Sequence, residues 1–276
     1  MTASMFTAVL AGAFGLVTGS FLNVVVYRVP AGLSVVAPAS ACPNCGHAIR
    51  RRDNIPVVSW IVLGGRCRDC DVSISPRYPI VELGTGILFA VVGLVALSPL
   101  EAIAPRDAVG RAVLLVAFLY LMAISVALAL IDLDTHRLPN AIVYPSAVVL
   151  LVLFAVASAL TGDWGALARG LLGAVLLGGG YLALAVAVPG GMGLGDVKLA
   201  VVLGLVLAYL GWGPLAVGAF GAFVVGGTVA ISLIILRRAR WRGGLPFGPS
   251  MLVGAWVGIL LGDRLMGAYL AILGVA

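Results

Sequence analysis

Long apolar stretches dominate this sequence and decide its fold class. Of the 276 residues, 62% are hydrophobic and 10% are charged, whereas soluble globular chains carry about 25% charged residues. A membrane-spanning helix needs roughly 20 mainly apolar residues. About eight stretches of this kind are present: 5–26, 79–97, 111–131, 141–160, 165–188, 197–212, 214–236 and 249–272. We therefore expect an all-α polytopic membrane protein with about eight transmembrane helices, the first of them a retained helix.

Basic residues between these stretches predict the orientation, because Lys and Arg are enriched in cytoplasmic loops. An N-terminus outside the cell places 13 of the 17 basic residues on the cytoplasmic side. These are Arg28, Arg50, Arg51, Arg52, Arg66, Arg68, Arg77, Arg137, Lys198, Arg237, Arg238, Arg240 and Arg242. The outer side keeps Arg106, Arg111, Arg169 and Arg264. The net charge of +6 is thus mainly a topology signal, and no basic, aromatic-studded face indicates nucleic-acid binding.

Residues 28–78 form the one long polar insertion, between the first two predicted helices. All four cysteines lie in it, as Cys42-Pro-Asn-Cys45 and Cys67-Arg-Asp-Cys70, with 21 residues between the two pairs. This is the spacing of a four-cysteine zinc site, because each tight turn directs two thiolates at one ion. The sequence therefore predicts a small cytosolic zinc-binding loop domain between the first two helices.

Disulfide bonds are the alternative for these cysteines. They rarely persist in the reducing cytosol, where the predicted topology puts the loop. A closed site of four thiolates leaves no coordination position for water, so we expect the Zn²⁺ to be structural. His47 follows the first pair closely and is interpreted as a surface residue.

Two aspartates stand at the junctions of apolar stretches and loops on one membrane face. Asp132 ends the third stretch and Asp196 opens the sixth. Two crossings separate them, so both carboxylates can reach the same depth. Two close carboxylates do not both ionise easily, and one of them keeps a proton. This arrangement suits peptide cleavage by water: the ionised acid takes a proton from water, and the neutral acid polarises the scissile carbonyl.

The neighbours of these aspartates leave alternatives open. Gly193 and Gly195 permit sharp backbone angles and a close approach of a substrate strand, although a plain inter-helix turn with an aspartate N-cap also fits. Asp134 competes with Asp132, because helix positions two apart lie on different faces and periodicity does not choose between them. Lys198 either stabilises a nearby carboxylate or anchors a cytoplasmic loop.

The order of these motifs along the chain resembles that of the type IV prepilin peptidases, which are membrane aspartic peptidases of the Gly-x-Gly-Asp type. Besides the cysteine pairs, the shared segments are Gly19-Ser-Phe-Leu-Asn23-Val-Val-Val-Tyr-Arg28-Val-Pro30, Arg77-Tyr-Pro-Ile-Val-Glu82, Ile131-Asp132 to Pro139-Asn140, and Gly191-Met-Gly-Leu-Gly-Asp196-Val-Lys198. The resemblance implies that the catalytic residues are Asp132, seven positions before Pro139, and Asp196.

The resemblance also implies a substrate and a second activity. Prepilins or pseudopilins, from type IV pili or type II secretion, would lose their short basic leader at the cytosolic face of the bacterial inner membrane. Long members of the family also N-methylate the new N-terminus with S-adenosylmethionine. The sequence has no Gly-rich Rossmann fingerprint for that cofactor. Candidate residues for the cofactor region are Asn23, Arg28, Arg77 and Glu82, with loop-packing contacts as the alternative.

We expect three parts: a first transmembrane helix (1–27), the zinc loop and methyltransferase region (28–78), and the peptidase domain (79–276).

Asp263 and Arg264 interrupt the last stretch, and we expect the pair to neutralise itself at the outer interface, with a shorter last helix as the alternative. A transporter and a non-catalytic zinc-loop scaffold are rival functions. A transporter predicts acids at helix centres and repeats of broken helices. In this sequence the acids cluster at one end of the stretches, and no repeat is evident.

Overall fold

The computed structural model describes residues 3–96, 105–188, 192–236 and 246–274. Apart from turns, loops and two isolated β-bridges, these residues are helical. The elements are α1 (Ala3–Arg28), η1 (Arg51–Asp53), α2 (Val58–Val62), α3 (Arg77–Ala96), α4 (Pro105–Thr135), α5 (Asn140–Thr161), α6 (Trp164–Ala187), α7 (Leu194–Leu210), α8 (Trp212–Ile235) and α9 (Gly248–Ile272). Outside the described residues lie Gly191 of the glycine motif and the predicted cytoplasmic residues Arg237, Arg238, Arg240 and Arg242.

Seven helices of the described residues are long and apolar enough to cross a membrane. They are α1, α3, α4, α5, α6, α8 and α9, and each contains one of the predicted apolar stretches or overlaps nearly all of it. The other predicted stretch, 197–212, corresponds to α7, which has 17 residues. The prediction of an all-α polytopic membrane protein is therefore confirmed, with seven candidate spans in the described ranges and α7 as a shorter helix.

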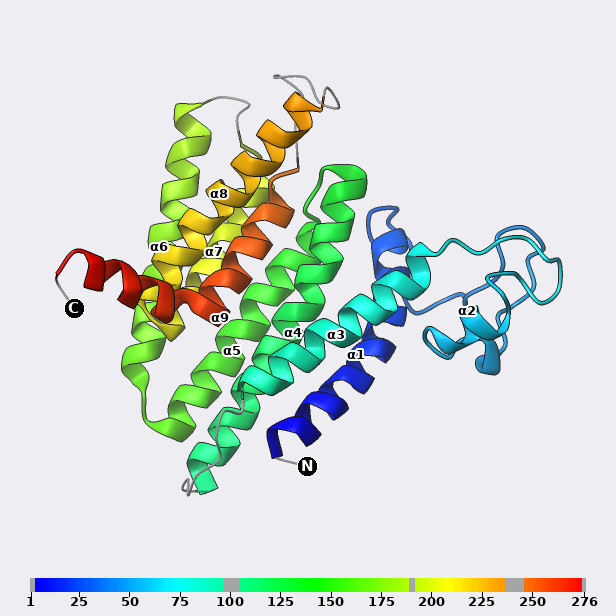
Figure 1. The fold of residues 1–276 in the computed structure, drawn as a ribbon, viewed down its shortest axis with the longest axis horizontal. Coiled ribbons are helices and arrows are strands. Elements are labelled where there is room, and N and C mark those ends of the chain that lie inside the picture. Colours follow the sequence, from blue (N-terminus) through cyan, green and yellow to red (C-terminus); the bar gives the residue numbers. More distant parts are fainter. Residues whose placement is uncertain (1–2, 97–104, 189–191, 237–245, 275–276) are drawn as a thin grey trace. The chain divides into compact units, whose positions relative to one another are not determined.

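The described residues divide into two compact units. Unit 1 contains α1, the loop with η1 and α2, α3, and Phe118–Ala127 of α4; unit 2 contains the other residues of α4 and helices α5 to α9. Within unit 1, α1 and α3 run side by side (Figure 1). Small residues permit their close approach, because a Cβ atom added to Gly15 would lie 2.9 Å from the Cα atom of Gly86.

Within unit 2, α7 is the central helix. It packs against α5, α6, α8 and α9, and ten of its residues are buried, namely Leu199, Ala200 and Val202–Tyr209. Glycines again bring helix backbones together: a Cβ atom on Gly204 would lie 2.9 Å from the carbonyl carbon of Gly173 in α6. The Gly-x-Gly-Asp sequence stands at the start of this helix, so the surrounding bundle fixes where Asp196 lies.

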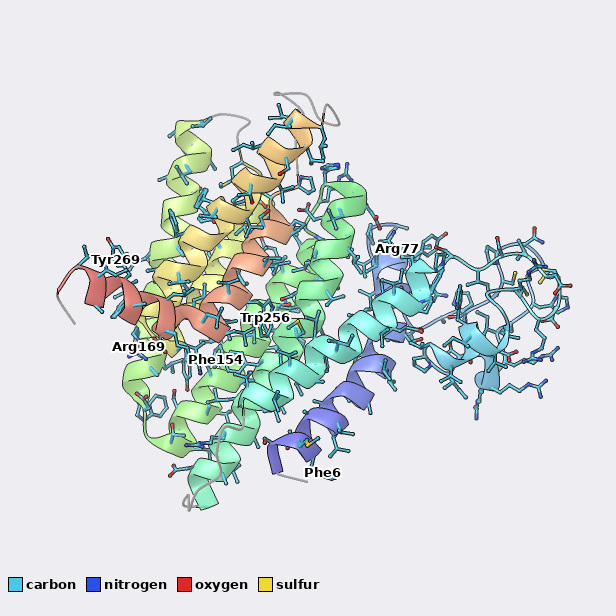
Figure 2. The ribbon with its side chains drawn as sticks, in the orientation of Figure 1. Phe6, Arg77, Phe154, Arg169, Trp256 and Tyr269 are labelled. Atoms are coloured by element: carbon cyan, nitrogen blue, oxygen red, sulfur yellow. The ribbon has the colours of Figure 1, made fainter. Side chains whose placement is uncertain are left out.

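The C-terminal end of α7 is held by a basic side chain. Arg169 of α6 donates from Nε to the carbonyl oxygen of Ala208 at 2.7 Å, and from a terminal nitrogen to that of Tyr209 at 2.8 Å. The last carbonyls of a helix have no intrahelical partner and carry partial negative charge, so a guanidinium there is stabilising. Phe154 of α5 stacks on the Tyr209 ring, with centroids 4.4 Å apart, and Figure 2 labels Arg169 and Phe154 at this end of the bundle.

The last helix differs from the expectation at its charged pair. α9 continues past Asp263 and Arg264 to Ile272, so it does not end at the pair. Among the described residues, ion pairs join Arg50 to Asp69 and Arg68 to Asp53, and none joins Asp263 to Arg264. Consecutive helix residues point about 100° apart, which explains why the pair does not close. The Asp263 carboxylate instead lies beside the start of α8, where a Cβ atom on Gly213 would be 3.1 Å from Asp263 Oδ1.

Candidate active site and metal centre

Asp132 lies in the last turns of α4 and is only 5% exposed. Its Oδ2 atom accepts a hydrogen bond of 3.0 Å from the backbone N–H of Gly248, the first residue of α9. The first N–H groups of a helix lack intrahelical partners and carry partial positive charge, so this is a favourable place for a carboxylate. A Cβ atom on Gly248 would lie 2.7 Å from that oxygen. Glycine is therefore the residue that lets the start of α9 reach Asp132.

Asp134, the rival of Asp132 in the sequence, is exposed. Two positions along a helix turn a side chain by about 200°, so the two carboxylates point to nearly opposite sides of α4. The structure places Asp132, and not Asp134, against the start of α9.

Asp196 is the third residue of α7. Its Oδ2 atom accepts from the backbone N–H of Gly193 at 3.2 Å, so the carboxylate also satisfies a donor just before the helix. Gly195 precedes it, and a Cβ atom there would lie 3.2 Å from Cβ of Leu138. Gly195 thus allows the Leu138 side chain to sit directly against the start of α7.

Contacts of Leu138 bring the two aspartates into one site within unit 2. Its side chain lies against Gly195, next to Asp196, and against Gly248, which binds Asp132. The carboxyl groups of Asp132 and Asp196 are close enough to interact electrostatically. Two carboxyl groups thus lie at one end of a helical bundle, each with a backbone N–H donor, and an arrangement of this kind is what water activation by an acid pair requires.

Lys198, one turn after the glycine motif, interacts with α5 rather than with an aspartate. Its Nζ atom donates to Asn140 Oδ1 at 3.0 Å and lies 5.2 Å from the centroid of the Tyr144 ring. A cation over an aromatic ring is stabilised by the ring's quadrupole. Lys198 therefore fastens the start of α7 to the start of α5.

Three aromatic side chains lie at the same end of unit 2. Tyr181 of α6, Phe223 of α8 and Phe247 before α9 have ring centroids 5.4 to 6.3 Å apart. Tyr181 is buried and feels the charge of Asp196. Tyr181 thus connects this aromatic cluster to the Asp196 side of the site, and electrostatic interactions are stronger in such apolar surroundings.

The four cysteines of the loop cluster in unit 1. Their sulfur atoms all lie within 4.8 Å of one another, and those of Cys42 and Cys70 are 3.8 Å apart. Four sulfurs about 2.3 Å from one tetrahedral ion are roughly 3.8 Å from each other, whereas a disulfide brings its sulfurs to about 2.05 Å. The four cysteines are free thiols. The cluster has the donor set and the size to hold one metal ion.

The two cysteine pairs repeat one backbone pattern. Cys42 N–H donates to the His47 carbonyl, and Cys67 N–H donates to the Val72 carbonyl. A β-bridge closes each turn, between Ala41 and Ala48 and between Arg66 and Ser73. Backbone N–H groups point at the sulfurs: those of Cys45 and Asn44 lower the pKa of the Cys42 thiol to about 6. In the same turn, the backbone N–H of His47 lowers the pKa of Cys45, but desolvation and the neighbouring thiols raise it on balance to about 12. The thiolate, which is the form that binds metal, is thus favoured at Cys42 and not at Cys45.

The candidate residues for a cofactor tie the loop to its flanking helices. Asn23 of α1 donates to the Tyr78 carbonyl at 3.3 Å. Arg28 donates to the carbonyls of Ser34 and Pro38 at 2.9 and 2.8 Å. Glu82, which is 9% exposed, accepts from the N–H of Val57 at 2.7 Å. Arg77 begins α3. These contacts join the loop to its flanking helices, and a role of the four residues toward S-adenosylmethionine stays a prediction.

Comparison with known proteins connects both parts of the chain to one family. The sequence model of the Bacterial Peptidase A24 N-terminal domain matches residues 13–96, and that of the Type IV leader peptidase family matches residues 119–231. A Prepilin leader peptidase/N-methyltransferase of Pseudomonas putida is 35% identical over 295 residues, covering 96% of this chain and 94% of that protein. The chain belongs to the type IV leader peptidase family.

Further relatives with the same name are found in Aeromonas salmonicida, 34% identical over 291 residues, and in Neisseria gonorrhoeae, 36% identical over 284 residues. They cover 94% and 92% of this chain, and 92% and 90% of their own lengths. No solved structure matches the chain. The match to the leader peptidase family contains both aspartates, and the N-terminal match contains all four cysteines.

Several residues around the two aspartates were not predicted from the sequence. Gly248 lies beyond the family match and is 116 residues from Asp132 in the chain, so no local pattern connects them. Its one sequence signal is the Gly-Pro pair that opens α9, since proline is favoured in the first turn of a helix. Tyr181 and Phe247 carry no spacing signal. His136, with φ of 52° just after α4, lies close enough to interact electrostatically with Asp132.

Proposed function

We propose that this protein is a prepilin leader peptidase in which Asp132 and Asp196 form the catalytic pair. The observation that carries the proposal is the meeting of the two carboxyl groups at one end of unit 2, through Leu138, Gly195 and Gly248. Both acids stand near helix ends, which favours a peptidase over a transporter with acids at helix centres.

The chemistry follows from two carboxyl groups that share one proton. The ionised acid removes a proton from a water molecule, which attacks the scissile carbonyl carbon. The neutral acid donates a hydrogen bond to the carbonyl oxygen and later delivers its proton to the leaving amine. The N–H of Gly248 holds Asp132 and the N–H of Gly193 holds Asp196, so neither carboxylate needs to reorient at the moment of attack.

The proposed substrates are prepilins or pseudopilins, whose basic leader is cut at the boundary of an apolar helix. We place the protein in the bacterial inner membrane with its N-terminus outside and the aspartates at the cytosolic face, because that orientation keeps most basic residues inside. Gly193, which is extended just before α7, is proposed to let an extended substrate segment approach Asp196 closely.

The cysteine cluster is proposed to bind Zn²⁺ in a structural role. Four thiolates complete a tetrahedron and leave no open position for substrate, as in structural zinc sites. The ion would be held by Cys42, Cys45, Cys67 and Cys70, and it would supply the covalent cross-link of a loop that has little core of its own.

Methylation of the new N-terminal residue is the proposed second activity, with S-adenosylmethionine as donor. The names of the relatives in three genera support it. The predicted division into a first helix (1–27), a zinc loop with the methyltransferase region (28–78) and a peptidase domain (79–276) is part of this proposal.

Single substitutions test the peptidase mechanism in the full-length protein reconstituted in lipid. Asp132→Asn and Asp196→Asn should each lower the rate of leader cleavage by about 10²–10⁴-fold, which is the usual contribution of a general acid or base. Asp134→Asn is the matched control, since its side chain is exposed two positions from Asp132, and it should cleave at close to the original rate. Mass spectrometry of a leader-bearing prepilin reports leader removal and an added methyl group together. Cleavage that survives either of the first two changes would disprove the proposed pair.

A further inference from the structure

The short helix α2 and the residues before it expose an apolar stripe in the cysteine loop. Val58, Ile61 and Val62 lie at positions i, i+3 and i+4 of α2, so they share one face, and Ile55 stands three residues before Val58, just outside the helix. Their exposed fractions are 50%, 52%, 65% and 74%. We call these four residues the α2 stripe. Exposed apolar residues are common singly, but four of them gathered at one short helix indicate a surface that meets an apolar environment.

The opposite face of α2 is bound to the loop, which fixes the direction of the stripe. The Ser59 hydroxyl accepts from the N–H of Ile55 at 2.9 Å and donates to the carbonyl of Arg52 at 3.0 Å. The indole Nε1 of Trp60 donates to the carbonyl of Ile74 at 3.1 Å. Because Ser59 and Trp60 are bonded to the loop, the helix is held in one orientation, with the stripe facing away from the loop.

A carboxylate of α3 fixes the position of α2 along the α3 axis, and therefore its depth relative to the membrane. Glu82 accepts from the N–H of Val57, directly before α2, at 2.7 Å. Val57 has φ of 62°, which is unusual for a β-branched residue. The bond to Glu82 therefore holds the backbone in one particular conformation where the chain enters α2. Glu82 is five residues beyond Arg77, the first residue of the candidate span, which places it about 7.5 Å along the helix axis. The stripe therefore begins beside a part of α3 that already belongs to the membrane span.

Two arginines precede the stripe. Arg51 and Arg52 form η1 with Asp53 and are exposed. The ion pairs of this loop involve Arg50 with Asp69 and Arg68 with Asp53. The bond from Ser59 to the Arg52 carbonyl keeps η1 next to α2. Positive charge beside an apolar stripe is the pattern of a segment that lies in the head-group region of anionic lipid.

We propose that the α2 stripe lies in the interface of an anionic lipid bilayer, with Arg51 and Arg52 beside lipid phosphate groups. Interfacial segments sink about 5–10 Å into the boundary of head groups and acyl chains, which agrees with the depth set by Glu82. Four side chains offer much less than the roughly 800 Å² per partner that a stable dimer buries. Two copies would also bring like charges together, and a basic leader would be repelled by the same arginines.

Photo-crosslinking in the full-length protein tests the proposed depth. The photoreactive residue p-benzoylphenylalanine replaces Val62 in one variant and Val36 in the control. Val36 is 87% exposed in the same loop, between two carbonyls bound by Arg28. Arg28 is nine residues, or about 13 Å, beyond Gly19, which lies beside Glu82. The control position therefore lies farther from the bilayer than the stripe.

Illumination in phosphatidylglycerol vesicles should give phospholipid adducts at position 62 in several-fold higher yield than at position 36, as measured by mass spectrometry. Adducts at position 62 that join two protein chains, or other segments of the same chain, would overturn the proposal. Equal lipid yields at the two positions would overturn it as well.

A change of lipid composition tests whether the positive charges of Arg51 and Arg52 lie beside lipid phosphate groups. Replacing phosphatidylglycerol with phosphatidylcholine should lower the lipid adduct at position 62 several-fold. The double change Arg51→Gln and Arg52→Gln should remove this dependence, with limited proteolysis as the check that the loop is folded. A dependence that persists without both arginines would contradict their assigned place at the phosphates.

Discussion

The cysteine loop of unit 1 and the α7 bundle of unit 2 are stabilised in different ways. Between residues 29 and 76, the buried residues are Cys42, Ser59 and Gly65, whereas α7 alone has ten buried residues. A segment with so small a core does not offset the loss of chain entropy by apolar burial, and small domains of this kind usually need a metal or disulfides. The bundle is therefore ordered by packing, whereas we expect the loop to be ordered by the proposed metal ion.

Glycine also has different roles in the two regions. In the bundle, Gly173, Gly204 and Gly248 lie where no Cβ atom fits. In the loop, a Cβ atom on Gly46 would meet nothing within 4 Å, but its φ of 73° disfavours a side chain. The bundle therefore selects glycine for space, and the loop selects it for backbone conformation.

Removal of the proposed Zn²⁺ should have the largest effect among the changes that test this difference between the loop and the bundle. Apparent binding free energies of structural zinc in small domains are about 10–16 kcal/mol, and in such domains they are folding free energies. Chelation, or the double change Cys67→Ser and Cys70→Ser, should therefore unfold the loop while α7 keeps its packing. Hydrogen exchange should show lost protection in residues 29–76 and retained protection in α7.

Cleavage measured on the same metal-free samples separates the two regions functionally. We expect the rate of leader cleavage to fall by less than about tenfold, since a general acid pair supplies far larger factors and the cysteines are distant in sequence from the aspartates. Re-addition of Zn²⁺ is the control and should restore the protection of the loop. A loop that stays protected without metal would contradict the contrast, as would abolished turnover with an intact fold.

The helices of both regions were predictable because long apolar runs are a strong signal. The stretch 141–160 became α5 at Asn140–Thr161, and 165–188 became α6 at Trp164–Ala187. The cysteine cluster was predictable because two short turns are a local pattern, and the cluster has the size for one ion. The sequence pattern did not choose between Asp132 and Asp134, since the choice depends on which face of α4 meets another helix.

Contacts between distant segments were not predictable. The bond from Gly248 to Asp132 joins two helix ends that no periodicity relates. The expected neutralisation of Asp263 by Arg264 was wrong for a similar reason: adjacency in sequence was taken for adjacency in space. The Asp263 side chain lies beside Gly213 of α8 instead.

Gly248→Ala is the second expected effect, and it tests the role of space in the bundle. The added Cβ atom would lie 2.7 Å from Asp132 Oδ2, so the carboxyl group must move. Displacement of a catalytic group by about 1 Å can lower the rate 10²-fold, and we expect kcat for leader cleavage to fall by about 10–10²-fold. KM should change little, since the residue binds Asp132 and not the substrate.

The matched control for Gly248 is Gly267→Ala in the same helix, where a Cβ atom would meet nothing within 4 Å. It should leave kcat unchanged, because alanine is a better helix former than glycine and no contact is disturbed. The assigned role of Gly248 is refuted if both variants, at equal thermal stability, cleave alike.

Gly46→Ala is the smallest expected effect, and it tests the role of backbone conformation in the loop. The two cysteine turns are equivalent, and their matching positions Gly46 and Asp71 both have positive φ, of 73° and 56°. A left-handed conformation costs a residue with a Cβ atom about 1–2 kcal/mol, which corresponds to about 5–30-fold weaker metal binding if the folded turn and the bound ion are linked. The reciprocal change Asp71→Gly relieves the same strain in the other turn, so it should leave the affinity equal or raise it. Competition with a metallochromic chelator measures both variants. Equal losses in the two would mean that these positions contribute through side-chain contacts, and that the loop, like the bundle, selects its residues for space.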